Sequence, residues 1–235
     1  MALIACRDAS FDYDGNIAVC GLNFQVCRGD YLCVVGENGS GKTTLIKGLL
    51  RLKPPRQGSV VTGEGLKLNQ IGYMPQQWQG QKDFPASVYE VIISGRLSNK
   101  PFYSKRDKEA VEEVIKQLKL DSLRNLCYRE ISGGQQQQVL LARALCSAKT
   151  ALLLDEPASG LDQGMAREVY KRINTINKEK GLTVVMVSHD IQSAVQYASH
   201  ILHLNKTQVF FGRTEDYVRS GAGREFLGMG SERHD

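Results

Sequence analysis

The sequence contains no apolar run long enough to cross a bilayer as a helix, which takes about 20 residues. Its longest apolar stretches, Ala151 to Leu154 and Leu182 to Val187, are far shorter. The first residues lack a charged leader followed by an apolar run and a small-residue cleavage site. We therefore expect a protein that neither spans a membrane nor is exported, and that acts inside the cell.

The six cysteines form no CxxC pair and no Cys/His cluster with the spacing of zinc ligands. Reduced and mostly packed thiols are the expectation, because free cysteine is among the most buried residue types. The net charge of +5 is modest, and acidic and apolar residues interrupt the basic ones between Arg96 and Lys108. That pattern is typical of a solvated face and gives only weak support to an anionic membrane surface. No nucleic-acid partner is expected.

Short β-type runs alternate with amphipathic segments along most of the chain. Apolar residues spaced three and four apart predict helices with one buried face, and apolar runs of four to six residues predict buried strands. Strands are expected near residues 31–35, 70–74, 151–154 and 183–187, helices near 43–52, 107–120, 132–145, 165–180 and 191–198, and a hairpin around 205–207. Strands that alternate with helices imply a parallel sheet covered on both faces.

The expected fold class is therefore α/β. Residues 81–138 show no clear strand, which indicates a helical insert in the sheet-containing core. We expect three segments: residues 1–80 as the first part of the core, residues 81–138 as the insert, and residues 139–235 as the second part of the core. No motif occurs twice, so a single functional unit is expected.

A glycine-rich loop follows the first expected buried strand. Gly36 to Thr43 reads GENGSGKT and fits the pattern GxxxxGK[ST] between a strand and a helix. Glycines let successive backbone N–H groups turn toward phosphate oxygens, and the helix N-terminus adds its positive dipole end. Lys42 would supply a positive charge for the β and γ phosphates, and the Thr43 hydroxyl would bind Mg²⁺.

Two adjacent carboxylates end a later buried strand. Asp155 and Glu156 follow Ala151 to Leu154, at the edge where open α/β sheets bind their ligands. Asp155 is the candidate for holding Mg²⁺ through water. Glu156 would orient and polarise the attacking water, a role that requires a carboxylate beside the phosphates. The plain alternative, a strand that merely ends in acidic residues, stays open on these residues alone.

Ile131 to Gln135 reads ISGGQ and lies between the phosphate loop and the acidic strand. Ser132 can cap the following helix while two glycines expose backbone N–H groups, which would give a second anion site. An ordinary capped helix start is the alternative. The segment resembles the signature sequence of ABC ATPases, although Ile131 stands where leucine is usual. Gln138 occupies a place where that family commonly has arginine, which could lower the ATPase rate.

Further elements of the ABC ATPase pattern follow in order. Tyr13 resembles the aromatic residue that stacks on adenine, with nearby Phe11 as a competitor. Gln76 resembles the glutamine that contacts Mg²⁺ and water and senses the permease, with Gln77 as its near alternative. His189 resembles the switch histidine that forms a hydrogen bond with the γ phosphate.

Ser159 to Asp162 resembles the loop through which two such subunits communicate. The resemblance covers nearly the whole chain and implies a P-loop NTPase core of the RecA-like type, with an N-terminal antiparallel β portion and a helical subdomain insert. It implies catalytic roles for Glu156, His189 and Gln76, and Mg²⁺ binding by Thr43, Gln76 and Asp155. The residues that it places at ATP are Tyr13, Gly36, Asn38, Gly39, Ser40, Gly41, Lys42, Thr43, Thr44, Ser132, Gly133, Gly134 and Gln135.

The resemblance also implies partners. Two copies would face head to tail and share each ATP, on the cytoplasmic side of a membrane whose permease is a separate chain. An extracytoplasmic solute-binding protein would take part indirectly. Residues 81–91 with Gly95 and Arg96, and residues 203–212, look like the same stretches of subunits that power zinc, manganese or iron import. A soluble ABC-type ATPase without a transport role, and a transporter ATPase for another solute, are the alternatives.

Overall fold

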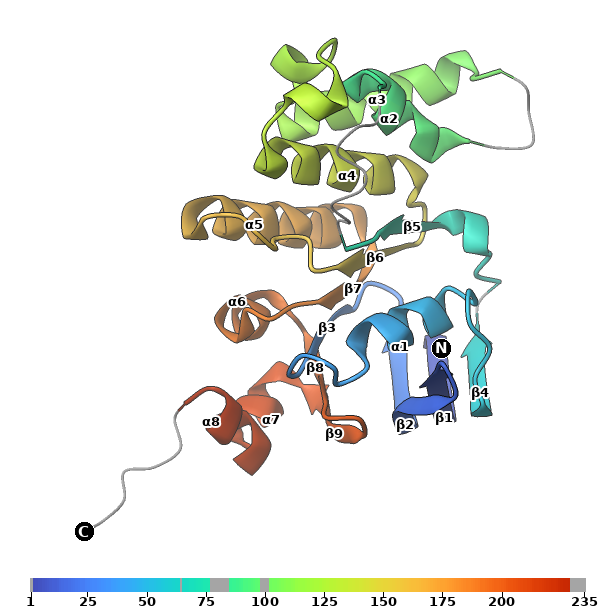
Figure 1. Cartoon of the computed structure of the whole chain (residues 1–235), viewed down its shortest axis with the longest axis vertical. Coiled ribbons are helices and arrows are strands. Elements are labelled where there is room, and N and C mark those ends of the chain that lie inside the picture. The colour runs from blue at the N-terminus through green and yellow to red at the C-terminus, as the bar shows by residue number, and fades with distance from the viewer. Residues whose placement is uncertain (1, 64, 77–84, 98–101, 229–235) are drawn as a thin grey trace. The chain divides into compact units, whose positions relative to one another are not determined.

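The structure is a computed structural model that describes residues 2–63, 65–76, 85–97 and 102–228. The chain forms two compact units, one of residues 1–66 with 170–235 and one of residues 67–169 (Figure 1). Helix α5 (Gln163–Lys180) starts in the second unit and ends in the first. None of the helices in the described ranges has the length and apolarity needed to cross a bilayer. The boundaries of the three expected segments stay a prediction.

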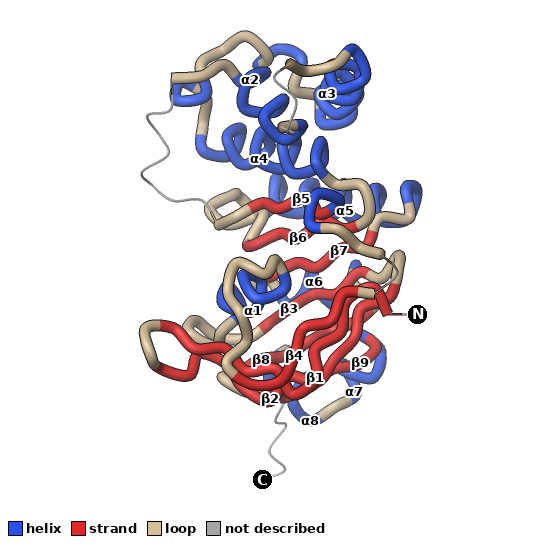
Figure 2. Tube along the Cα trace, turned by 90° about the vertical axis from the view of Figure 1, so that its right-hand side faces the viewer, coloured by secondary structure: helices blue, strands red, loops and turns tan. Residues whose placement is uncertain are grey.

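The first unit contains an antiparallel sheet of three strands. The strand β1 (Ala2–Tyr13) lies between β2 (Asn16–Cys27) and β4 (Gln57–Thr62), as the red strands of Figure 2 show. Buried and exposed residues alternate along β2, as expected for a sheet with one covered face. The expected N-terminal antiparallel portion is therefore present.

Four further strands of this unit run in the order β7-β3-β8-β9. The strands β3 (Tyr31–Val35), β7 (Thr183–Val187) and β8 (His200–Leu204) are parallel, and β9 (Gln208–Arg213) pairs antiparallel with β8. Every residue of β3 and β7 is buried, which explains why these segments read as continuous apolar runs. The expected hairpin at residues 205–207 joins β8 to β9.

The helices of the first unit are α1 (Lys42–Leu49), α6 (Ile191–Tyr197), α7 (Thr214–Arg219) and α8 (Gly221–Phe226). The sequence did not predict α7 and α8. Their anchor is Tyr217, which is buried and whose hydroxyl lies 3.1 Å from the Nδ1 atom of His203 on β8. Burial lowers the pKa of His203, which favours the neutral form of its ring.

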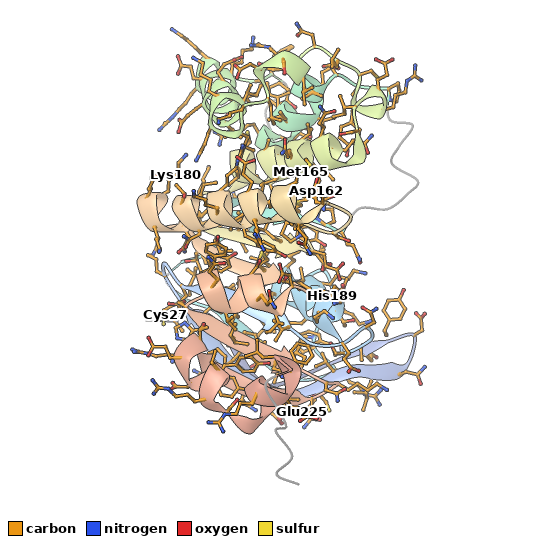
Figure 3. The ribbon with its side chains drawn as sticks, turned by 90° about the vertical axis from the view of Figure 1, so that its left-hand side faces the viewer. Cys27, Asp162, Met165, Lys180, His189 and Glu225 are labelled. Carbon is orange, nitrogen blue, oxygen red and sulfur yellow. The ribbon has the colours of Figure 1, made fainter. Side chains whose placement is uncertain are left out.

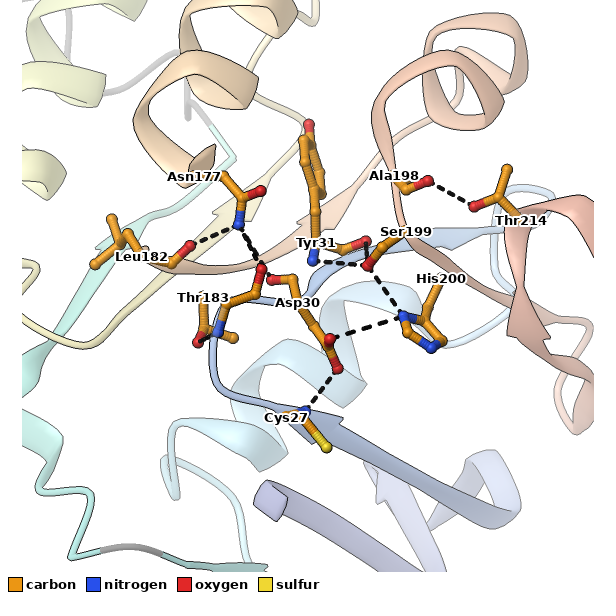
Figure 4. Close-up of polar contacts among 11 residues, drawn as sticks. Cys27, Asp30, Tyr31, Asn177, Leu182, Thr183, Ala198, Ser199, His200 and Thr214 are labelled. Carbon is orange, nitrogen blue, oxygen red and sulfur yellow. Dashed lines mark hydrogen bonds and ion pairs between the residues drawn. The ribbon is translucent and has the colours of Figure 1, made fainter. Parts of the chain in front are cut away.

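Polar contacts hold the first residues of β3, at the opposite end of this strand from the glycine-rich loop (Figure 4). The Asn177 amide donates hydrogen bonds to the carbonyl oxygens of Gly29, at 2.9 Å, and Leu182, at 2.7 Å. The backbone N–H of Tyr31 donates to the Ser199 hydroxyl at 3.0 Å. Because buried amides need partners, these bonds hold the turn before β3 in one conformation.

The second unit pairs β5 (Ile71–Met74) with β6 (Ala151–Asp155) in parallel, with Met74 opposite Leu154. Its helices are α2 (Val88–Ile93), α3 (Lys105–Leu118) and α4 (Gly133–Ser147). Helix α4 packs on β5 and on both other helices. Gly72 permits the approach of α4 to β5, because a Cβ atom there would lie 2.1 Å from the carbonyl oxygen of Ala144.

Helices α2, α3 and α4 each begin at a serine whose side chain and backbone pair with the residue three positions later. The pairs are Ser87 with Glu90, Ser104 with Asp107, and Ser132 with Gln135. The hydrogen bonds from Ser104, followed by that from Arg96, lower the pKa of Asp107 to about 2. Such capping boxes are local in sequence, so they set where these helices start. Helix α3 accordingly begins two residues before the predicted position.

Candidate nucleotide site

The glycine-rich loop connects the end of β3 to the first residue of α1, as predicted. Gly36, Gly39 and Gly41 have positive φ values of 146°, 79° and 98°. A Cβ atom at Gly36 would lie 2.2 Å from the carbonyl oxygen of Leu204, and one at Gly41 would lie 2.7 Å from the Cβ of Val19. The loop therefore takes a shape that only glycine permits at these places.

Two polar side chains are buried in this loop. Lys42 is 6% exposed, and its ammonium group donates to the carbonyl oxygens of Gly36 and Glu37, both at 2.8 Å. Ser40 is 3% exposed, and in the described part of the chain its hydroxyl has no hydrogen-bond partner. A buried cation beside a buried hydroxyl that lacks a partner fits a phosphate group, which supplies negative charge and acceptor oxygens.

The N-terminus of α1 adds backbone donors to the loop. Its N-cap, Gly41, makes no side-chain capping bond, and the first turn carries no acidic residue. The first N–H groups of a helix have no partner inside the helix, so they attract an anion. Thr43 and Thr44 are half-buried in this first turn, and Asn38 is exposed in the loop.

Of the two aromatic candidates for adenine stacking, only Tyr13 is exposed. Tyr13, the last residue of β1, is 56% exposed, and the ammonium groups of Lys47 and Lys53 lie 5.9 and 5.8 Å from its ring centroid. Phe11 is fully buried against Gly48, where a Cβ atom would lie 2.3 Å from the Phe11 ring. Phe11 therefore packs α1 onto β1, and of these two rings only that of Tyr13 is accessible.

His189 follows β7 at the same sheet edge from which the glycine-rich loop leaves β3. The N–H of Ser188 donates to the carbonyl oxygen of Val34 at 3.1 Å, which ties the end of β7 to the end of β3. His189 itself is exposed, and Figure 3 labels it. Parallel strands end at one edge, so the first unit presents a histidine and a phosphate-type loop at that edge.

The second unit places three of the predicted site residues where β5 and β6 end. Asp155 is the last residue of β6 and is 1% exposed. Gln76, two residues after β5, donates from its amide nitrogen to the Oε2 atom of Glu156 at 2.9 Å. Because the amide nitrogen is used in this bond, the amide oxygen is the atom with which Gln76 can bind a cation. Gln77, the alternative to Gln76 for contacting Mg²⁺ and water, lies outside the described residues.

Glu156 has a positive φ of 54°, which is uncommon for a residue with a side chain. Its carbonyl oxygen accepts a hydrogen bond from the amide of Gln137 at 3.1 Å. Gln137 is 3% exposed and belongs to α4, so it ties this helix to the backbone of Glu156. Burial, followed by the negative charge of Asp155, raises the pKa of Tyr73 to about 12.

Sequence reasoning missed both Gln137 and Tyr73. The four successive glutamines at residues 135–138 were the only available signal for Gln137, and nothing in the sequence distinguishes one of them from the others. The structure separates them, because Gln135 closes the capping box while the amide of Gln136 donates to the carbonyl oxygen of Tyr128 at 2.9 Å.

The signature segment begins helix α4 as predicted. The Ser132 N–H donates to the Gln135 side chain at 2.9 Å, and the Gln135 N–H donates to the Ser132 hydroxyl at 3.3 Å. A Cβ atom at Gly134 would lie 3.0 Å from a side-chain atom of Met165 and 3.1 Å from one of Leu161. These distances are close to the shortest that side chains permit. A Cβ atom at Gly133 would meet none of the described atoms within 4 Å. Packing inside the described unit thus accounts for Gly134 but not for Gly133.

The segment from Ser159 to Asp162 leads into α5. The N–H of Ser159 donates to the carbonyl oxygen of Glu156 at 3.1 Å, and the N–H of Met165 donates to the Asp162 carboxylate at 2.9 Å. Asp162 therefore caps the start of α5, and Figure 3 shows it at the opposite end of that helix from Lys180. The loop that the resemblance assigns to communication is held between the carboxylate strand and this helix start.

A model of the ABC transporter family matches residues 19–159, a span that runs from β2 past the end of β6. The chain belongs to the ABC transporter family. The zinc uptake system ATP-binding protein ZurA of Listeria innocua is 31% identical, over 98% of this chain and 93% of that protein. The manganese transport system ATP-binding protein MntB of Bacillus subtilis is 37% identical, over 83% of this chain and 80% of that protein.

Solved structures agree with this family. One described as an inward-facing metal-chelate type ABC transporter is 28% identical with a TM-score of 0.85, over 97% of this chain and 90% of that one. A dimeric bacterial ABC transporter cassette is 25% identical with a TM-score of 0.75, over 90% and 98%. The expected P-loop NTPase fold is confirmed, and the chain is an ABC-type ATPase that binds ATP and hydrolyses it.

Two segments of this ABC ATPase bear on which ion it could serve. His200 and His203 lie in β8. The described residues hold no cluster of three or more His, Cys, Asp or Glu side chains able to bind a metal. Residues 81–84 of the segment that resembles metal-ion importers lie outside the described ranges.

Proposed function

We propose that this ABC ATPase drives the import of a small solute, a divalent metal ion, through a permease that is a separate chain. Relatives described as zinc and manganese transport ATP-binding proteins, 31% and 37% identical over most of the chain, support this cargo class. The subunit would lie peripherally on the cytoplasmic side of the membrane, with an extracytoplasmic solute-binding protein as an indirect partner.

The phosphate groups of ATP would be held by the first unit. Lys42 would exchange its bonds to two loop carbonyls for the β and γ phosphates, and the Ser40 hydroxyl and the backbone N–H groups of the loop would donate to phosphate oxygens. Tyr13 would stack on the adenine, since it is the exposed aromatic residue at the end of β1. His189 would donate a hydrogen bond to the γ phosphate.

The carboxylates of the second unit would carry the chemistry. Glu156 would accept a proton from the attacking water, and Gln76 holds the Glu156 carboxylate by the bond of 2.9 Å. The positive φ of Glu156 supports this role, because backbone strain at a residue with a side chain persists where its surroundings enforce it. Gln137 supplies part of that enforcement by binding the carbonyl oxygen of Glu156.

Thr43, Gln76 and Asp155 would bind Mg²⁺. A hydroxyl, an amide oxygen and a carboxylate are the hard oxygen donors that this ion takes, so the donor set fits. When bound, the ion would neutralise part of the negative charge that develops on the β and γ phosphates.

Two copies would face head to tail, so that the signature residues Ser132 to Gln135 of one copy meet the nucleotide bound at the phosphate loop of the other. The position of Gly133 supports this arrangement, because no described atom lies within 4 Å of where its Cβ would be, and such a glycine permits a ligand to approach the backbone closely. Loss of the γ phosphate contacts on hydrolysis would weaken the shared interface, and its closing and reopening would move the permease.

The observation that carries this proposal is the contact between Gln76 and Glu156 at the end of the carboxylate strand. Its test is Glu156→Gln, which keeps the shape of the side chain and removes the base. We expect kcat for phosphate release to fall by about 10³-fold while ATP stays bound in a stable dimer, seen by light scattering. Glu179→Gln on the exposed end of α5 is the matched control and should leave kcat unchanged. Turnover of Glu156→Gln at the wild-type rate would remove Glu156 from catalysis.

The cargo is tested in cells with the untagged permease present. We expect one multispanning membrane protein to copurify with the chain, and cellular uptake of Zn²⁺ or Mn²⁺ to stop with the Glu156→Gln variant. Copurification of a permease without an effect on either ion would indicate a non-metal solute. The absence of any membrane partner, with ATPase activity intact, would indicate an ABC ATPase that does not serve transport.

A further inference from the structure

Two buried hydroxyl groups of the first unit lie in contact, and one of them belongs to the residue before His189. The Tyr170 hydroxyl of α5 is 2.9 Å from the Ser188 hydroxyl, which immediately precedes His189. The two residues are 3% and 1% exposed. A buried ring on the inward face of α5 can pack as an apolar group, and that role does not require a hydroxyl.

The Ser188 hydroxyl closes the turn that carries His189. This hydroxyl accepts a hydrogen bond from the N–H of Asp190 at 3.0 Å and lies 3.4 Å from the carbonyl oxygen of Asp190, so it bridges the two residues that flank the histidine. On the other side, the N–H of Ser188 donates to Val34 of β3 at 3.1 Å. The backbone before His189 is therefore fixed to the sheet, and the turn that carries it is closed by one side chain.

The residue after His189 is fixed as well. The Asp190 carboxylate accepts from the N–H of Ser193 at 3.0 Å and from its hydroxyl at 2.6 Å, which caps the start of α6. His189 is thus an exposed side chain on a turn whose two neighbours are both held. The direction in which its ring points depends on how firmly the Ser188 hydroxyl closes that turn.

A count of donors shows what Tyr170 contributes. A serine hydroxyl has one hydrogen and two acceptor lone pairs. When Tyr170 donates to Ser188, the second lone pair takes the N–H of Asp190 and the hydrogen is directed at the Asp190 carbonyl, so every position is used. Without the Tyr170 hydroxyl, a buried acceptor loses its partner and the Ser188 side chain can rotate away from Asp190.

We propose that Tyr170 is a positioning residue that acts through Ser188 to hold His189 toward the γ phosphate. The proposal rests on the role of His189 in the proposed function. In this assignment Tyr170 acts on the histidine through the Ser188 hydroxyl, from which its own hydroxyl is 2.9 Å away. It supplies the third hydrogen bond of the hydroxyl that closes the turn.

The test is Tyr170→Phe, which keeps the buried ring and removes only the hydroxyl. We expect kcat for ATP hydrolysis to fall about fivefold, the factor that one hydrogen bond of typical strength gives, with KM for ATP and the melting temperature nearly unchanged. Tyr31→Phe is the matched control, because Tyr31 is also buried and its hydroxyl donates to the Met186 sulfur at 3.4 Å. The control should keep the wild-type kcat, and an equal loss in both variants would overturn the proposal.

A double-mutant cycle tests the route through Ser188. Ser188→Ala should lower kcat at least as much as Tyr170→Phe, and the double variant should be no slower than Ser188→Ala alone. Multiplicative losses would mean that Tyr170 acts by another route and would overturn the proposal. The ring resonances of His189 in nuclear magnetic resonance spectra should shift with Tyr170→Phe and stay in place with Tyr31→Phe, which decides the matter even if a variant is too slow to assay.

His189→Ala separates this proposal from the one on which it rests. If His189→Ala keeps the wild-type rate, the role of His189 fails, and the positioning role fails with it. If His189→Ala is slow while Tyr170→Phe has normal kcat and normal His189 resonances, only the positioning role fails.

Discussion

Two helices of this chain begin at glycine-rich turns, α1 in the first unit and α4 in the second, and they begin in different ways. The turn before α1 uses three glycines with positive φ, carries a buried lysine and lacks a side-chain cap. The start of α4 has no positive φ at its two glycines and carries a complete capping box between Ser132 and Gln135. The start of α4 satisfies part of its backbone donors with its own side chains, whereas the start of α1 has no side-chain cap.

The difference indicates a division of work between the two starts. A turn that joins a cation to the N-terminus of a helix without a side-chain cap can hold phosphates without help. A start that is already capped and has no cation binds an anion weakly by itself, so under the proposed function it would act when another copy brings a nucleotide to it. We therefore expect changes at α1 to alter nucleotide affinity, and changes at the start of α4 to alter turnover.

The largest effect on binding is expected at Lys42. Lys42→Ala removes the buried cation, and the affinity for ATP should fall by at least about a hundredfold, because ionic hydrogen bonds to phosphate are lost. Titration with a fluorescent ATP analogue measures this. Lys47→Ala is the matched control on the same helix, since Lys47 lies near the Tyr13 ring and not in the loop, so its effect should be small. Equal losses of ATP affinity in both variants would contradict a special role of the buried loop lysine in binding the phosphates.

The next effect is expected on turnover at the other start. Ser132→Arg places a bulky cation at the surface that would face the second copy, so ATPase activity should be lost while the isolated chain keeps its ATP affinity. Ser104→Arg is the control, because Ser104 heads the same kind of capping box on α3 and its replacement costs a similar stability of about 1 kcal/mol. If Ser132→Arg weakens ATP binding as Lys42→Ala does, the two helix starts do not divide the work.

The smallest change adds a single methyl group at the start of α4 and separates stability from turnover. Gly133→Ala has open space around it, so the melting temperature should stay the same or rise slightly, since alanine is the better helix former. ATPase activity should still fall, by about tenfold, because the methyl group lies where a nucleotide from the second copy would approach. Thermal unfolding and phosphate release measure the two quantities.

Gly134→Ala is the companion variant. Its new methyl group would press on the flexible ends of Met165 and Leu161, so it should lower stability as well as activity. Normal turnover by Gly133→Ala would contradict the shared nucleotide and leave Gly133 unexplained.

Elements with strong local signals were predictable. The strand at residues 183–187 and the helix starts near residues 43, 132 and 191 followed from apolar runs, caps and glycines, which act within a few residues. Helices α7 and α8 were not, because each has six residues and no strong period. Helices this short form only when tertiary contacts, such as that of Tyr217 with His203, hold them.

The pair Phe11 and Tyr13 shows what strand periodicity does not report about the site. Residues two apart in a regular strand point to the same face, so periodicity does not separate the two rings, and the family resemblance alone favoured Tyr13 with Phe11 as its competitor. In the structure the pairing of β1 with β2 shifts register between Phe11 and Asp12. That irregularity turns Phe11 into the core under α1 and leaves Tyr13 exposed at the strand end. A register shift depends on the partner strand, which no local pattern reports.

The sequence by itself determined the residue types and the order of the motifs: a glycine-rich loop with Lys42, a capped signature helix, a carboxylate pair and a histidine after a buried strand. These depend on chemistry between close neighbours in the chain. Only the tertiary structure decided the partners, such as Gln76 and Gln137 for Glu156 and Tyr170 for Ser188. Such contacts join residues far apart in sequence, and their geometry exists only after the strands and helices have packed.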